Sequence, residues 1–77
     1  MKVVPCYLKV LVANKEMREG RTISLRKVAQ ETGVREYTVY GFANNTLREY
    51  PAEAVAKLCE YLGCEVGDLL KLEEVSV

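Results

Sequence analysis

The chain has 77 residues, of which 49% are hydrophobic and 29% are charged, and its formal net charge at pH 7 is zero. This length predicts a single small domain over residues 1–77, and the composition is that of an ordinary globular protein. No apolar run approaches the roughly 20 residues of a membrane-spanning helix. The first residues lack the features of a signal peptide, so we expect a cytoplasmic protein that does not enter a membrane.

The first part of the chain predicts one helix followed by a loop. Pro5 suits the first turn of a helix, and Leu8, Leu11 and Val12 recur at helical spacing up to about Met17. The charged segment REGRT, which contains a glycine, then predicts a loop.

Two short helices separated by a tight turn are predicted next. Ser24 has the side chain of an N-cap for a helix over residues 25–32. Gly33 is placed to end that helix in the left-handed conformation. The chain then re-enters a helix over residues 35–44. This arrangement over residues 25–44 is typical of a helix-turn-helix motif.

The remaining residues predict two further helices and two weakly alternating ends. Pro51 opens a fourth helix, which Gly63 ends, and a short fifth helix follows over residues 66–71. The segments MKVV and LEEVSV at the two ends of the chain can pair as a small two-stranded ribbon. The predicted fold class is therefore all-α, with five helices.

The three cysteines are interpreted as small buried apolar groups. Histidine is absent and no C-x-x-C pair occurs, so neither a metal site nor a cofactor is expected. If Gly63 ends its helix with a Schellman motif, the residue just beyond Gly63 contacts the residue four positions before it. We therefore expect Cys59 and Cys64 to be buried neighbours that remain reduced in the cell, with Cys6 elsewhere.

The sequence resembles one known family in two segments, LRKVAQETGVREYTVYGFAN at residues 25–44 and KLCEYLGCEVGDLL at residues 57–70. The family is the phage repressor and Cro type (XRE-like) of helix-turn-helix DNA-binding domain. The first segment has a small residue at its fifth position, a glycine at its ninth, and apolar residues where that family keeps them. The resemblance implies a repressor-like fold, double-stranded DNA as the partner, and a recognition helix over about residues 35–44. It covers nearly the whole chain.

The sequence departs from the family pattern in three places. Leu25 stands where the family usually has a glutamine that contacts phosphate, and Arg35 stands where it usually has a serine or threonine cap. The loop before residue 25 is also several residues longer. Arg26 and Lys27 lie in the first turn of the predicted helix and are placed to contact phosphate instead; otherwise they are two solvated basic residues.

One face of the predicted helix over residues 35–44 carries the candidate base contacts. At 3.6 residues per turn this face contains Glu36, Tyr37, Tyr40, Gly41 and Asn44, while Val39, Phe42 and Ala43 face the core. Glu36 can accept a hydrogen bond from cytosine, Tyr37 can contact a thymine methyl group or a phosphate, and Gly41 would let DNA approach closely. Otherwise this is an ordinary polar face. The predicted DNA-contacting residues are Arg26, Lys27, Arg35, Glu36, Tyr37, Thr38, Tyr40, Gly41, Asn44 and Arg48.

The charges are divided unevenly along the chain. Residues 1–50 contain nine Lys and Arg residues and five Glu residues, whereas residues 51–77 contain two Lys residues and six acidic residues. One basic and one acidic face would produce this pattern, although an uneven solvated surface would also do so. No base, carboxylate pair or phosphate loop suggests catalysis or a small-molecule substrate.

Two functions remain open on the sequence alone. The first is a sequence-specific transcriptional regulator that binds a palindromic operator, with a homodimer expected from small size and from the symmetry of such sites. The second is a protein-interaction module on the same fold, such as an antitoxin-like or anti-repressor partner, that does not itself contact DNA.

Overall fold

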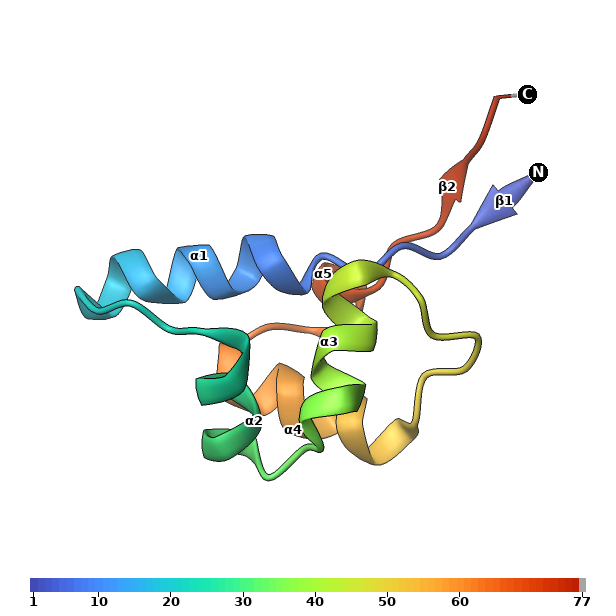
Figure 1. The fold of residues 1–77 in the computed structure, drawn as a ribbon. Helices are drawn as coiled ribbons and strands as arrows, with labels where there is room; N and C mark the ends of the chain where they lie inside the picture. The colour runs from blue at the N-terminus through green and yellow to red at the C-terminus, as the bar shows by residue number, and fades with distance from the viewer. Residues whose placement is uncertain (77) are drawn as a thin grey trace.

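The computed structural model describes residues 1–76 and is mostly helical, with five helices and a small antiparallel ribbon in that range (Figure 1). In chain order the elements are β1 (Lys2–Val3), α1 (Leu8–Glu19), α2 (Leu25–Thr32), α3 (Glu36–Asn44), α4 (Ala52–Leu62), α5 (Val66–Leu69) and β2 (Glu73–Glu74). The expected five-helix fold and the ribbon formed by the two chain ends are both confirmed. The fifth helix ends two residues earlier than predicted.

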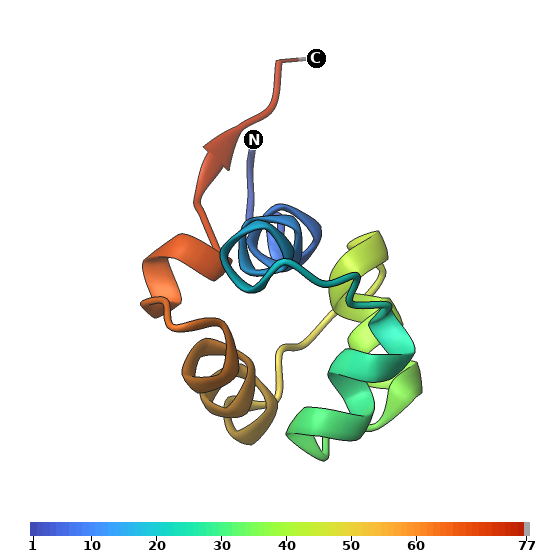
Figure 2. The same ribbon diagram turned by 90° about the vertical axis from the view of Figure 1, so that its left-hand side faces the viewer.

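The helices form an arch around one core. Viewed along α1, α2 and α3 lie on one side and α4 and α5 on the other (Figure 2). The largest side chains that are fully buried come from α1, α2, α3, α4 and α5, so the core is shared by every helix. They are Phe42, Leu8, Leu58, Leu69, Val28 and Val39.

Local capping interactions account for the two helices of the motif. The Ser24 side chain accepts a hydrogen bond from the Lys27 backbone N–H at 3.1 Å, so the expected N-cap of α2 is confirmed. Gly33 ends α2 with φ of +78°, a conformation that costs glycine little because it has no Cβ. Arg35 occupies the N-cap position of α3, but its side chain makes no capping hydrogen bond.

The N-terminal segment is extended up to Cys6, so the first helix begins at Leu8 rather than at Pro5. Lys2 pairs with Glu74 and Val3 with Glu73, and the same register continues to a bridge between Cys6 and Leu70. The carbonyl of Pro5 accepts a hydrogen bond from the Lys71 N–H, as expected for an extended segment beside this bridge. Pairing with the distant C-terminal strand therefore overrides the local preference of Pro5 for a first helical turn.

Two of the three cysteines, Cys59 and Cys64, meet at the C-terminal end of α4. The Cys64 N–H donates to the Cys59 carbonyl at 3.0 Å, as a Schellman motif requires, and Cys59 is buried while Cys64 is half-buried. Burial raises the pKa of Cys64 to about 11, and Cys59 beside it adds to this rise. The expected contact between Cys59 and Cys64 is confirmed, but Cys64 is less buried than expected.

A network of charged and polar side chains joins α1, α2 and α4. Arg21 pairs with Glu19 at 2.7 Å and with Glu31 at 3.0 Å, and Glu31 also accepts a hydrogen bond from the Tyr61 hydroxyl. Lys15 completes the network, because its ammonium pairs with Glu19 at 2.6 Å, donates to the Tyr61 carbonyl and lies 4.4 Å from the centre of the Tyr61 ring. These contacts hold the loop between α1 and α2 against α4.

This network predicts a dependence of stability on acid pH. The hydrogen bond from Arg21 lowers the pKa of Glu31 below its ordinary 4.5, and the hydrogen bond from Lys15 does the same for Glu19. The stabilisation from these carboxylates is therefore complete above about pH 4.5 and is lost as the pH falls through their lowered pKa values. In Glu31→Gln the unfolding free energy should therefore fall less than in the parent chain as the pH is lowered below about 4.5. The measurement is urea denaturation at a series of pH values.

The control for this experiment is Glu60→Gln, since Glu60 is exposed and makes no ion pair with residues 1–76. An identical acid dependence in the parent chain and Glu31→Gln would contradict the assigned role of the network.

Candidate nucleic-acid interface

Helix α3 presents an exposed stripe formed by Glu36, Tyr37, Tyr40 and Asn44. The Tyr37 side chain is 82% exposed and Tyr40 is 40% exposed, although both are large and partly apolar. On the opposite side of the helix Val39 and Phe42 are completely buried. Four of the five residues expected on the outward face therefore lie there.

The fifth residue, Gly41, does not. Gly41 is buried, and a Cβ placed on it would lie 2.6 Å from both Cγ and Cδ2 of Leu47 in the loop after α3. The expectation that its bare backbone faces DNA is wrong, because the space beside it is filled by a side chain of the same protein. Thr38 is likewise removed from the exposed stripe, since it is half-buried and faces α4.

The contact between Gly41 and Leu47 predicts coupled effects of two substitutions. Glycine inside a helix costs about 1 kcal/mol relative to alanine, so Gly41→Ala alone would ordinarily stabilise the fold. Here the added methyl group must displace Leu47, and we expect the unfolding free energy to remain unchanged or to fall. In a Leu47→Ala background the obstruction is gone, and Gly41→Ala should raise the unfolding free energy by up to about 1 kcal/mol. Equal effects in both backgrounds, measured by urea denaturation, would refute the contact.

Four exposed cations come before and after the stripe along the chain. Arg26 and Lys27 lie in the first turn of α2, Arg35 precedes α3, and Arg48 lies in the loop between α3 and α4. None of them forms an ion pair with another group in residues 1–76, whereas Lys2, Lys15, Arg21 and Lys57 do. Lys27 is close enough to Glu31 to contribute to the lowered pKa of that carboxylate. Because these four side chains form no ion pair within residues 1–76, their positive charges can interact with an anionic partner.

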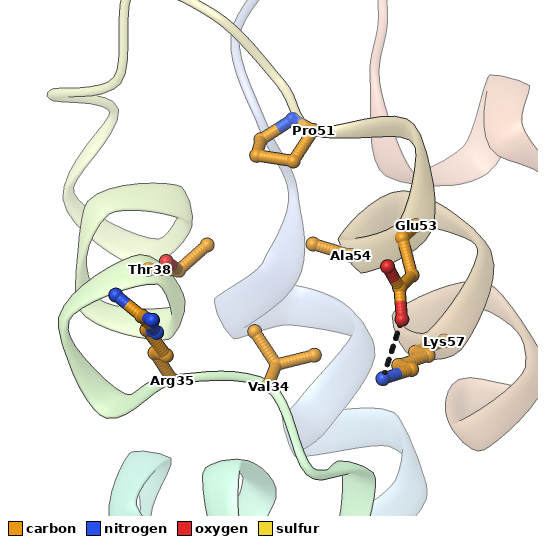
Figure 3. A pocket seen from close by; sticks show the side chains of 7 residues that line it. All are labelled: Val34, Arg35, Thr38, Pro51, Glu53, Ala54 and Lys57. Atoms are coloured by element: carbon orange, nitrogen blue, oxygen red, sulfur yellow. Dashed lines mark ion pairs between the residues drawn. The ribbon is translucent and has the colours of Figure 1, made fainter.

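A hollow of about 250 Å³ separates the start of α3 from the start of α4 (Figure 3). Val34, Pro51 and Ala54 line it with apolar surface, and Arg35, Thr38 and the Glu53–Lys57 ion pair, at 3.0 Å, complete the lining. No side chain caps the first backbone N–H groups of either helix within the described chain. Such groups bind anions readily.

Sequence reasoning did not identify the residues that hold the loop between α3 and α4. Asn45 has φ of +57°, Leu47 fills the space beside Gly41, and the Tyr50 ring lies 5.2 Å from that of Phe42, measured between centroids. The sequence predicted only that the helix ends at about residue 44. Nothing in the local sequence indicates the partners of Leu47 and Tyr50, because those partners lie on other elements.

The described residues contain neither a membrane-spanning helix nor a metal-binding cluster. No helix in residues 1–76 combines the length and apolarity needed to cross a membrane. The same residues contain no group of three or more His, Cys, Asp or Glu side chains arranged to hold a metal ion.

Comparison with known proteins assigns the family. Residues 15–74 match the model of the Cro/C1-type HTH DNA-binding domain, a segment that includes all of α2, α3, α4 and α5. Neither the curated proteins nor the solved structures contain a match to the chain. Because the matched residues make up most of the sequence, the chain belongs to the Cro/C1-type helix-turn-helix family and is a DNA-binding regulator.

Proposed function

We propose that this protein is a cytoplasmic transcriptional regulator that recognises a specific palindromic operator as a homodimer, with α3 in the major groove. The observation that carries the proposal is the exposed stripe on α3, with exposed cations before and after it along the chain that form no ion pair in the described part of the protein. A recognition helix of this motif enters the major groove with its first residues nearest the base edges. Glu36 and Tyr37 are those residues.

The stripe has the chemistry to distinguish bases. The Glu36 carboxylate can accept a hydrogen bond from the amino group of cytosine, and an aromatic ring such as that of Tyr37 can pack against a thymine methyl group. Asn44 and the hydroxyl of Tyr40 lie further along the same exposed side of the helix. The binding energy of these side chains can depend on the base sequence. Contacts of the cations with phosphate carry no sequence information.

The cations are assigned to the DNA backbone. Arg26 and Lys27 at the start of α2 and Arg48 beyond the end of α3 lie at either end of the motif. Phosphate contacts of this kind set the orientation of a protein on the duplex without reading its sequence. They also make the affinity depend steeply on salt, because each contact releases a condensed counterion.

The small size of the contact that one copy makes with DNA supports a homodimer. One copy reads a single half-site with one short helix, and two copies related by a twofold axis would read two half-sites one turn of DNA apart. A palindromic site matches that symmetry.

Selection of bound sequences from a random duplex pool tests the proposal. We expect a palindromic consensus, binding that weakens steeply as salt increases, and two copies bound per duplex. If the bound sequences share no consensus but binding still weakens steeply with salt, the protein binds DNA only non-specifically, which contradicts the proposal. Absence of duplex binding at low salt would favour the protein-interaction module over this proposal.

A further inference from the structure

The loop between α3 and α4, residues 45–51, is attached at both of its ends to the N-terminal segment of the chain. The side-chain oxygen of Asn45 accepts a hydrogen bond from the Cys6 backbone N–H at 2.5 Å. At the other end of the loop the Tyr50 hydroxyl donates to the Val4 carbonyl at 2.8 Å. Arg48 lies between these two attachments, is exposed, and makes no ion pair with the rest of residues 1–76.

The same loop is also fastened to α3. The Thr46 N–H donates to the Gly41 carbonyl at 3.0 Å, and the Leu47 side chain occupies the space that a Cβ on Gly41 would need. The Tyr50 ring packs against that of Phe42, whose side chain is completely buried. The loop is therefore held on one side by the recognition helix and on the other by residues 4–6.

Residues 4–6 are in turn held by the C-terminal end of the chain. Cys6 forms a bridge with Leu70, and the Pro5 carbonyl accepts from Lys71 at 3.2 Å. Because backbone pairing fixes this segment, its Val4 carbonyl and Cys6 N–H are presented at defined positions. The contacts of Asn45 and Tyr50 transmit that position to the loop.

We infer that Asn45 and Tyr50 are positioning residues for DNA binding, which clasp the loop to the N-terminal segment so that Arg48 reaches a phosphate of the same duplex that α3 reads. This inference rests on the proposed function. Binding of the long Arg48 side chain costs conformational entropy. Because the loop is already anchored, little backbone entropy is lost in addition when the guanidinium binds. The clasp acts on DNA only through Arg48.

Two substitutions remove one contact each with little change elsewhere. Asn45→Gly removes the acceptor for the Cys6 N–H but retains the left-handed backbone, which glycine adopts without strain. Tyr50→Phe removes the hydroxyl and keeps the ring against Phe42. The matched control is Tyr61→Phe, which removes a hydroxyl that donates to Glu31 of α2 rather than to the N-terminal segment.

Each variant is made in the parent chain and in an Arg48→Ala background, and its affinity is titrated against a duplex selected by the parent chain at several salt concentrations. With Arg48 present, Asn45→Gly and Tyr50→Phe should weaken binding and make the slope of log K against log salt shallower by up to about 0.9, as for one lost phosphate contact. In the Arg48→Ala background neither should weaken binding further. Tyr61→Phe should leave both backgrounds unchanged.

The outcomes separate this inference from the proposed function. If the parent chain selects no duplex, the proposed function fails and the inference fails with it. If the parent binds but Asn45→Gly and Tyr50→Phe have equal effects in both backgrounds, or no effect, the clasp does not act through Arg48 and the inference alone is overturned. Hydrogen exchange at the Cys6 amide, which should become faster in Asn45→Gly, checks the contact without DNA.

Discussion

Replacing Phe42 by alanine should destabilise the domain severely. Phe42 is completely buried and has the largest side chain of the core, and its ring packs against that of Tyr50. Truncation of a buried phenylalanine costs about 3–5 kcal/mol, because the lost apolar contacts leave a cavity. That is a large part of the roughly 4–12 kcal/mol expected for a domain of this size, so the midpoint of unfolding should move to a much lower urea concentration.

The measurement is urea denaturation followed by circular dichroism, with Tyr37→Ala as the matched control. Tyr37 lies on the same helix but its side chain is 82% exposed, and replacing it should change the unfolding free energy by no more than about 0.5 kcal/mol. Equal destabilisation by the two substitutions would mean that the assigned core and exposed faces of α3 are wrong.

Glu36→Gln should change which operator the protein prefers. The substitution removes a negative charge from the surface that we propose faces the phosphates, so non-specific affinity should rise. The amide also has donors that a carboxylate lacks, and the preference should shift from cytosine towards adenine at one position of each half-site. The expected loss of discrimination at that position is about 1–3 kcal/mol. The measurement is a titration against the selected operator and its single-base variants at two salt concentrations.

Arg26→Ala is the companion variant in this experiment. Arg26 is assigned to phosphate, so its loss should weaken binding to all sequences about equally and reduce the salt slope by roughly one unit. The assigned docking of the motif is contradicted if Arg26→Ala alters the base preference, or if Glu36→Gln leaves the preference profile as it was.

The sequence was sufficient wherever a structural feature depends on neighbours along the chain. Ser24 and Gly33 mark the ends of α2 because a side-chain cap and a left-handed residue act within one helical turn. The exposed stripe of Glu36, Tyr37 and Tyr40 follows from helical periodicity, which puts one face of α3 against the core and the opposite face in solvent. The family itself was also evident from the motif and the LGCEVGDLL segment.

The tertiary structure decided what depends on partners distant in sequence. Gly41 fits either close approach of DNA or close approach of another side chain, and only the position of Leu47 shows that the second is the case. Pro5 suits a helix start, but pairing with residues 70–74 makes it extended. The attachment of the Arg48 loop through Asn45 and Tyr50 likewise joins segments that lie far apart along the chain. Local propensities of about 1 kcal/mol or less are outweighed by such long-range contacts, which periodicity and capping patterns do not encode.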